Sequence, residues 1–179
     1  LPICWDLPTR LFHCLLATAF RGAWLTAASE RWRDLHALLG YTMLVLVAFR
    51  LVWGFVGTRY ARFASFVYGP GDVLAYLRKL TNLRAAHCTG HNPVGSWAIY
   101  GLLGLVRLVG ATGIATFNDA GGHWVEDLHE GTANAMLALV FVHIAGVLAG
   151  SVLHRENLVG AMLTGYKAGR ADDGIGRPR

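Results

Sequence analysis

Long apolar runs separated by polar connectors dominate the chain. Four of these runs are long enough to cross the roughly 30 Å hydrocarbon core of a bilayer as a helix. Within them charged residues are few, and small residues that let membrane helices approach closely are frequent. The pattern therefore predicts four membrane-spanning helices, over residues 11–28, 36–56, 95–112 and 131–153. In the long connector over 57–93, Asp72 to Leu80 has the pattern of a short amphipathic helix at the membrane surface.

Composition supports a membrane bundle rather than a soluble domain. The 179 residues are 54% hydrophobic and only 15% charged, which is too apolar for an ordinary soluble protein of this size. The absence of internal repeats favours a single domain over residues 1–167, followed by a polar tail over 168–179. The fold class we predict is all-α, an integral membrane four-helix bundle.

The distribution of charge gives this bundle an orientation. The net charge of +5 comes mainly from basic residues in the 57–93 connector and in the tail, whereas the 113–128 connector has no Lys or Arg. Basic residues mark cytoplasmic segments of membrane proteins, so this distribution favours membrane orientation over nucleic-acid binding. We expect a multi-pass protein of the bacterial inner membrane with both termini cytoplasmic, in contact with lipid and not with nucleic acid.

The cysteines indicate no metal or disulfide framework. Cys4, Cys14 and Cys88 are an odd number without CxxC spacing, which fits neither a zinc site nor covalent haem attachment. Their roles stay unassigned. The first apolar run lacks a small-residue cleavage site, so no cleavable signal peptide is expected.

Four histidines sort into two pairs by their depth in the predicted bundle. His129 and His143 are 14 residues apart on one helix, which places them on the same face and ~21 Å apart along the axis. His36 opens the second span at the outer level of His129, and His13 lies near the inner start of the first span at the level of His143. Two stacked bis-imidazole sites in a four-helix bundle are what two b-type haems require.

Other uses of these histidines stay open at this point. A lone histidine in a span is commonly a packing residue or part of a proton relay, although such relays usually recruit Asp or Glu, and the four spans contain neither. Zinc or copper needs ligands within a few ångströms of one another, which the 14-residue spacing does not give within one helix.

Arginines in the apolar runs are candidate partners for the anionic haem propionates. Arg50 lies 14 residues beyond His36 and so at the inner level, close to Arg10. Arg107 lies nearer the outer level, and Arg21 lies between the two. For Arg10 and Arg50, snorkelling to the inner interface is an equally good interpretation.

Polar residues at the two membrane surfaces are candidates for exchange with redox partners. At the inner surface a quinone site is expected from His91, Asn92, His154 and Asn157. At the outer surface the acidic segment 121–127 would attract a basic soluble protein, although it also fits an ordinary solvated turn.

Six short motifs carry a family resemblance that covers nearly the whole chain up to Lys167. They begin with Trp-Asp-Leu-Pro-Thr-Arg-Leu-Phe-His at 5–13 and continue at 50–57, 90–95, 129–130, 143–146 and 154–159. Together they resemble the bacterial cytochrome b561 superfamily, which includes the membrane cytochrome b subunits of nickel-iron hydrogenases and formate dehydrogenases. The resemblance implies a four-helix bundle with two b haems that passes electrons between a periplasmic partner and membrane quinone. It also implies the ligands His13, His36, His129 and His143.

The chain departs from that family pattern in three places. Cys14 follows the first ligand where relatives often have Trp, and Arg21 stands where an apolar residue is usual. We expect no counterpart of the fifth helix of the longer hydrogenase subunits, an expectation that favours resemblance to short subunits that work with c-type cytochromes.

The functional hypothesis is transmembrane electron transfer through two b-type haems between a periplasmic redox partner, a c-type cytochrome or dehydrogenase, and membrane quinone or quinol. Such a subunit is an electron carrier, and whether it is itself an enzyme with quinone oxidoreductase activity stays open. A second hypothesis is a stand-alone oxidoreductase for a small molecule such as superoxide or quinone. A third is a haem-free transporter of protons or ions.

Overall fold

The described chain is helical throughout its regular elements. The computed structural model describes residues 5–58, 61–81, 93–154 and 157–165, and these ranges contain no strand. The long helices are α1 (Leu7–Thr26), α2 (Arg33–Val56), α4 (Pro93–Phe117) and α5 (His123–His154). The shorter ones are α3 (Pro70–Thr81) and α6 (Leu158–Thr164), with single 3-10 turns at Glu30–Trp32 and Phe63–Ser65. The all-α prediction is confirmed for the described residues.

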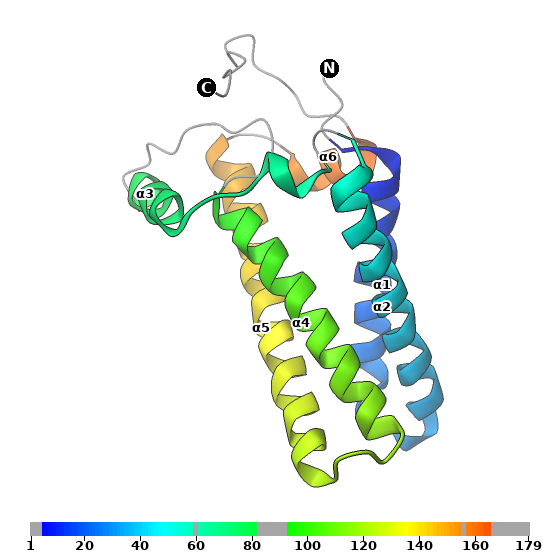
Figure 1. Cartoon of the computed structure of the whole chain (residues 1–179). Helices are drawn as coiled ribbons and strands as arrows, with labels where there is room; N and C mark the ends of the chain where they lie inside the picture. Colours follow the sequence, from blue (N-terminus) through cyan, green and yellow to red (C-terminus); the bar gives the residue numbers. More distant parts are fainter. Residues whose placement is uncertain (1–4, 59–60, 82–92, 155–156, 166–179) are drawn as a thin grey trace.

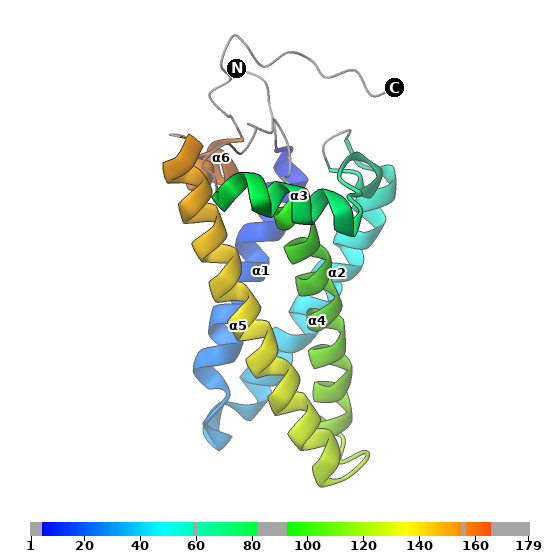
Figure 2. The ribbon, with the colours of Figure 1, turned by 90° about the vertical axis from the view of Figure 1, so that its left-hand side faces the viewer.

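The four long helices run side by side, and α3 lies across one end of them (Figures 1 and 2). α1 packs along α2, α2 along α4, and α4 along α5. α6 lies beside the start of α1, where the backbone N–H of Trp5 donates to the carbonyl of Gly165 at 3.5 Å. We call this the terminal end of the molecule. The opposite end, formed by residues 27–32 and 118–122, is the connector end.

All four long helices begin earlier than the apolar pattern predicts, and the difference is largest for α1 and α5. α1 begins at Leu7 instead of residue 11, because the Asp6 carboxylate caps it by accepting a hydrogen bond from the backbone N–H of Thr9 at 3.1 Å. α5 begins at His123 instead of residue 131 and carries Glu126 in its first turn, where a carboxylate favours the positive end of the helix dipole. Polar residues therefore extend this helix beyond the apolar run.

The tight turn between α4 and α5 uses backbone conformations that favour glycine. Gly121 and Gly122 have φ values of 101° and 69°, and Asp119 adopts φ 53°. This turn brings the end of α4 back against the start of α5, so His129 lies opposite the last turns of α4.

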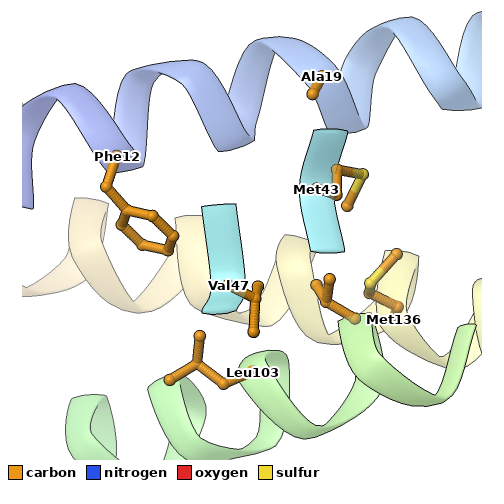
Figure 3. Packing of buried hydrophobic residues seen from close by; sticks show 7 residues of the cluster. Phe12, Ala19, Met43, Val47, Leu103 and Met136 are labelled. Carbon is orange, nitrogen blue, oxygen red and sulfur yellow. The ribbon is translucent and has the colours of Figure 1, made fainter. Parts of the chain in front are cut away.

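The apolar core lies between the long helices, at mid-length. Side chains of Phe12 and Ala19 from α1, Met43 and Val47 from α2, Leu103 and Val106 from α4, and Met136 from α5 form one buried cluster (Figure 3). Met136 stands halfway between His129 and His143 on α5. The cluster therefore separates the two histidine levels with apolar packing.

Large apolar side chains cover much of the outside of the helices. α2 with its preceding turn (Glu30–Val56), α4 (Pro93–Phe117) and most of α5 (His123–Leu153) are long and apolar enough to cross a membrane. α1, which carries Arg10, His13 and Arg21, does not meet that measure, so its role as a fourth span stays a prediction. An apolar exterior of this kind suits lipid contact.

Hydrogen bonds fasten the helices together at the terminal end. The Asp6 carboxylate accepts from Trp53 Nε1 and Thr58 Oγ1, both at 2.9 Å, so the start of α1 is tied to the end of α2. Partial burial raises the pKa of this carboxyl, but the hydrogen bonds from Thr9, Trp53 and Thr58 outweigh it and the pKa is lowered. Arg10 donates to the last carbonyls of α6, those of Met162 and Leu163, which holds α6 against α1.

Candidate functional site

Two histidines from different helices face each other near the connector end. His36 opens α2 and His129 lies in the second turn of α5, and their ring centres are 6.2 Å apart with the ring planes at 86°. A coordinated metal lies about 2.0–2.1 Å from a histidine nitrogen, and the ring centre about 1.1 Å beyond it, so two imidazoles on opposite sides of one metal have centres about 6 Å apart. The observed spacing fits a bis-imidazole metal site.

The hydrogen bonds of both rings leave the same nitrogen available. Nδ1 of His36 lies 2.9 Å from the carbonyl oxygen of Ala23, and Nδ1 of His129 lies 3.1 Å from that of Val109. A carbonyl only accepts, so each Nδ1 carries the proton and donates. Nε2 is then the unprotonated nitrogen of both rings, with its lone pair available to a metal.

A second pair of histidines lies towards the terminal end. The rings of His13 on α1 and His143 on α5 are both half-buried and close enough to interact electrostatically. Along α5, His143 lies ~21 Å from His129 by helical rise. The four histidines thus lie at two levels, His36 with His129 towards the connector end and His13 with His143 towards the terminal end, with much of the core cluster between them.

The paired histidines fit bis-imidazole ligation of haem better than a cluster of three or four metal ligands. Among the described residues, no three His, Cys, Asp or Glu side chains gather around a common point as they do at a zinc ion. Each histidine pair spans α5 and the α1–α2 side of the molecule. Axial haem ligands in helix bundles are placed in this way, on facing helices.

The four candidate arginines differ sharply in their surroundings. Arg50 on α2 is only 3% exposed, its guanidinium lies 4.9 Å from the centre of the Phe63 ring, and it interacts electrostatically with Asp6 and Tyr100. Among the described residues nothing accepts a hydrogen bond from its Nη1. A buried guanidinium with an unused donor, at the level of His13 and His143, suits a propionate carboxylate.

The other three arginines are less enclosed. Arg10 uses its guanidinium on the carbonyls of α6, and Arg107 is exposed and donates from Nε to the carbonyl of Leu103, one turn earlier on its own helix, at 3.2 Å. Arg21 is exposed on α1. The structure places none of these three as deeply as Arg50.

The expected quinone residues are covered only in part. Asn157 caps α6, its side-chain oxygen accepting from the backbone N–H of Gly160 at 2.6 Å. His91 and Asn92 lie outside the described residues, as does the side chain of His154, the last residue of α5. Cys4, Cys88 and the 168–179 tail also lie outside them, whereas Cys14 is a half-buried free thiol.

Thr112 and Gly113 on α4 lie against the His129 ring, and the sequence did not predict this contact. Thr112 Oγ1 lies 3.2 Å from His129 Nδ1, and a side chain at Gly113 would put a Cβ 2.9 Å from Cε1 of the same ring. A threonine in an apolar helix usually bonds its own backbone, so nothing in the sequence singles it out. The chain order alone does not show which face of α4 meets α5.

Comparison with known proteins gives one family match. The family model described as prokaryotic cytochrome b561 matches residues 4–165, which is most of the chain. Searches among curated proteins and among solved structures found no match.

Proposed function

The chain belongs to the prokaryotic cytochrome b561 family, and on that premise we propose that it carries electrons across the bacterial inner membrane through two b-type haems. Family membership makes it a membrane electron-transfer cytochrome that binds haem b. In the proposal His36 and His129 hold the outer haem, and His13 and His143 hold the inner one. A haem iron supplies a one-electron couple, and two axial imidazoles leave it no open position for oxygen chemistry.

The outer histidine pair carries this proposal. Its 6.2 Å ring separation and the engagement of both Nδ1 atoms by backbone carbonyls prepare two Nε2 lone pairs for one metal. A packing role would require neither feature. The inner pair is supported by the proximity of His13 to His143 and by helical spacing.

The proposed topology is a four-helix membrane bundle with α1 as the fourth span and the terminal end in the cytoplasm. Basic residues of the 57–93 connector and the tail favour that orientation. The quinone pool would then be met at the terminal end, where His91, Asn92, His154 and Asn157 are the proposed contacts. A periplasmic c-type cytochrome or dehydrogenase would be met at the connector end.

Arg50 is the strongest candidate to hold a propionate of the inner haem. Arg10 is a further proposed partner at that haem, Arg107 is proposed at the outer haem, and Arg21 could serve either. A positive charge close to a haem favours its reduced form, because reduction lowers the charge on the iron. Arg50→Gln is expected to lower the midpoint potential of the inner haem by about 59 mV, a tenfold change in a one-electron equilibrium. Redox titration measures this shift. Arg107→Gln, which removes an exposed guanidinium, serves as the comparison and should shift it less.

The connector end is acidic, which suits a cationic protein partner. Six exposed carboxylates and two arginines lie at this end or within about two helical turns of it: Glu30, Asp34, Asp119, Glu126, Asp127, Glu130, Arg31 and Arg33. This surface attracts a basic soluble protein and repels an anion such as superoxide. Electrostatics at this end therefore favour a basic protein partner over superoxide, whereas an uncharged quinone would be neither attracted nor repelled.

Neutralising part of that surface is expected to slow electron exchange with a basic c-type cytochrome. The double variant Asp127→Asn, Glu130→Gln should lower the bimolecular rate about threefold to tenfold at low ionic strength, with the difference fading above about 0.5 M salt because the charges are screened. Stopped-flow absorbance measures the rate. Asp72→Asn, on α3 at the terminal end, is the control; equal slowing in that variant would argue against docking at the connector end.

Visible spectroscopy of the purified protein separates the proposal from a haem-free transporter. The reduced protein is expected to show the Soret and α bands of b-type haem. A colourless protein with full helical content would refute haem binding and leave the transporter hypothesis in its place.

A further inference from the structure

The hydroxyl of Thr112 lies beside Nδ1 of His129, one of the two histidines proposed to hold the outer haem. Its Oγ1 is 3.2 Å from His129 Nδ1, and the residue is only 7% exposed. The same Nδ1 lies 3.1 Å from the carbonyl oxygen of Val109. His129 Nδ1 therefore has two oxygen neighbours, both supplied by one turn of α4.

The Thr112 hydroxyl accepts the hydrogen bond that it shares with His129 Nδ1. A hydroxyl has a single proton, and Thr112 Oγ1 lies 2.9 Å from the Leu108 carbonyl and 3.0 Å from that of Val109, where that proton is donated. Its lone pairs remain, and Nδ1 of His129 must carry a proton because it also faces a carbonyl oxygen. Thr112 consequently accepts, and the Nδ1–H is shared between two acceptors.

Gly113 allows this approach. A Cβ at Gly113 would lie 2.9 Å from Cε1 and 3.3 Å from Nδ1 of the His129 ring, closer than side chains tolerate. The absence of a side chain lets the ring lie directly against α4, within reach of Thr112 and the Val109 carbonyl. Thr112 and Gly113 together hold the His129 imidazole against α4.

His36, the other proposed ligand of the outer haem, has fewer hydrogen-bond acceptors at its Nδ1 than His129 has. Within the described part of the chain, Nδ1 of His36 has one acceptor, the carbonyl of Ala23 at 2.9 Å in the last turn of α1. The two rings of the outer pair therefore differ in the number of acceptors on the Nδ1–H. Each acceptor draws that proton away from the ring and makes the imidazole a stronger electron donor to a metal.

We propose that Thr112 is a positioning residue that makes His129 the more electron-donating ligand of the outer haem and so lowers the reduction potential of that haem. The inference rests on the proposed haem ligation by His36 and His129. A more donating axial ligand stabilises the oxidised iron, and hydrogen bonding to the ligand is one of the means by which proteins set haem potentials. Thr112 thereby sets the driving force for electron exchange at the connector end.

The test is a spectroelectrochemical titration of the full-length, haem-loaded protein. Thr112→Val keeps the shape of the side chain but leaves His129 with a single acceptor, as His36 has. We expect the outer haem to become easier to reduce by a threefold to tenfold change in its reduction equilibrium, where tenfold equals 59 mV. The inner haem should keep its potential, and a His143→Ala sample identifies which wave belongs to the outer haem.

Two further variants make each outcome informative. Thr112→Ser keeps the hydroxyl and is expected to keep the original potential. Thr42→Val removes an exposed hydroxyl that donates to the Leu38 carbonyl at 2.8 Å, and is expected to shift neither haem. An unshifted outer potential in Thr112→Val, or an equal shift of both haems, overturns the inference.

Loss of the outer haem from the valine variant is also decisive. If the serine variant then retains the haem at its original potential, the hydroxyl is responsible, as we infer; if the serine variant loses it too, the inference fails. These results are distinct from failure of the proposed function, which would appear as a wild-type protein without b-type haem.

Discussion

Replacing His143 with alanine is expected to reduce the haem content from two b haems per chain to one. The variant removes one axial ligand of the inner site, while the outer pair, ~21 Å away along α5, keeps both of its imidazoles and their carbonyl partners. Quantifying haem b against protein in the purified variant measures the change. Circular dichroism shows whether the helices are retained.

The matched control is His123→Ala on the same helix. The His123 side chain is 98% exposed and lies 3.2 Å from Glu126 at the connector end, so its removal should leave two haems in place. If His143→Ala kept both haems, or lost both with its helical content intact, the pairing of His13 with His143 would be wrong.

Replacing His36 with alanine is expected to give the reciprocal phenotype. Without the outer haem, the remaining redox centre lies ~21 Å farther from the connector end, and electron exchange with a soluble basic cytochrome should slow by more than about a hundredfold. Quinol, which is proposed to react at the terminal end, should still reduce the inner haem. Stopped-flow reduction by each partner measures both rates.

Comparing the reaction rates of His36→Ala with those of His143→Ala shows which end of the protein reacts with the soluble cytochrome and which reacts with quinol. That variant should exchange electrons with the soluble cytochrome but lose its reaction with quinol. If quinol reactivity instead followed the outer haem, the quinone site would lie at the connector end, and the proposed contacts at His91, Asn92, His154 and Asn157 would be incorrect.

Helical regularity explains how far the sequence predicted this site. Apolar runs fixed the existence of the long helices, and rise per residue placed His36 level with His129 and His13 level with His143. The ring centres of the first pair lie 6.2 Å apart, and both rings of the second pair are half-buried. Their binding of haem iron stays a prediction, which the family match supports.

Helix rotation and tertiary hydrogen bonds were not readable from the chain. Arg50, Arg107 and Arg21 all interrupt apolar runs, yet packing buries only the first of them, because the rotation of each helix depends on its neighbours. The same holds for Thr112, whose importance comes from meeting His129 across two helices. The hydrophobic pattern of the sequence therefore does not reveal the contacts of such residues.

Helix ends were also predicted imperfectly, because polar residues continue the helices beyond the apolar runs. Asp6 caps α1 and at the same time accepts from Trp53 and Thr58, contacts that are remote in sequence. α5 extends eight residues outwards from its expected start at residue 131. Hydropathy reports the part of a helix that suits lipid, and capping chemistry sets where the helix begins.

Electron transfer across a sealed membrane tests the central proposal most directly. The purified protein is reconstituted into liposomes that contain ferricyanide, and a reductant that does not cross the bilayer is added outside. We predict that wild-type protein reduces the enclosed ferricyanide, and that His143→Ala and His36→Ala each abolish this reaction while His123→Ala preserves it. Wild-type vesicles with two b haems per chain and no internal reduction, or undiminished reduction in both ligand variants, would contradict a path through two stacked haem sites.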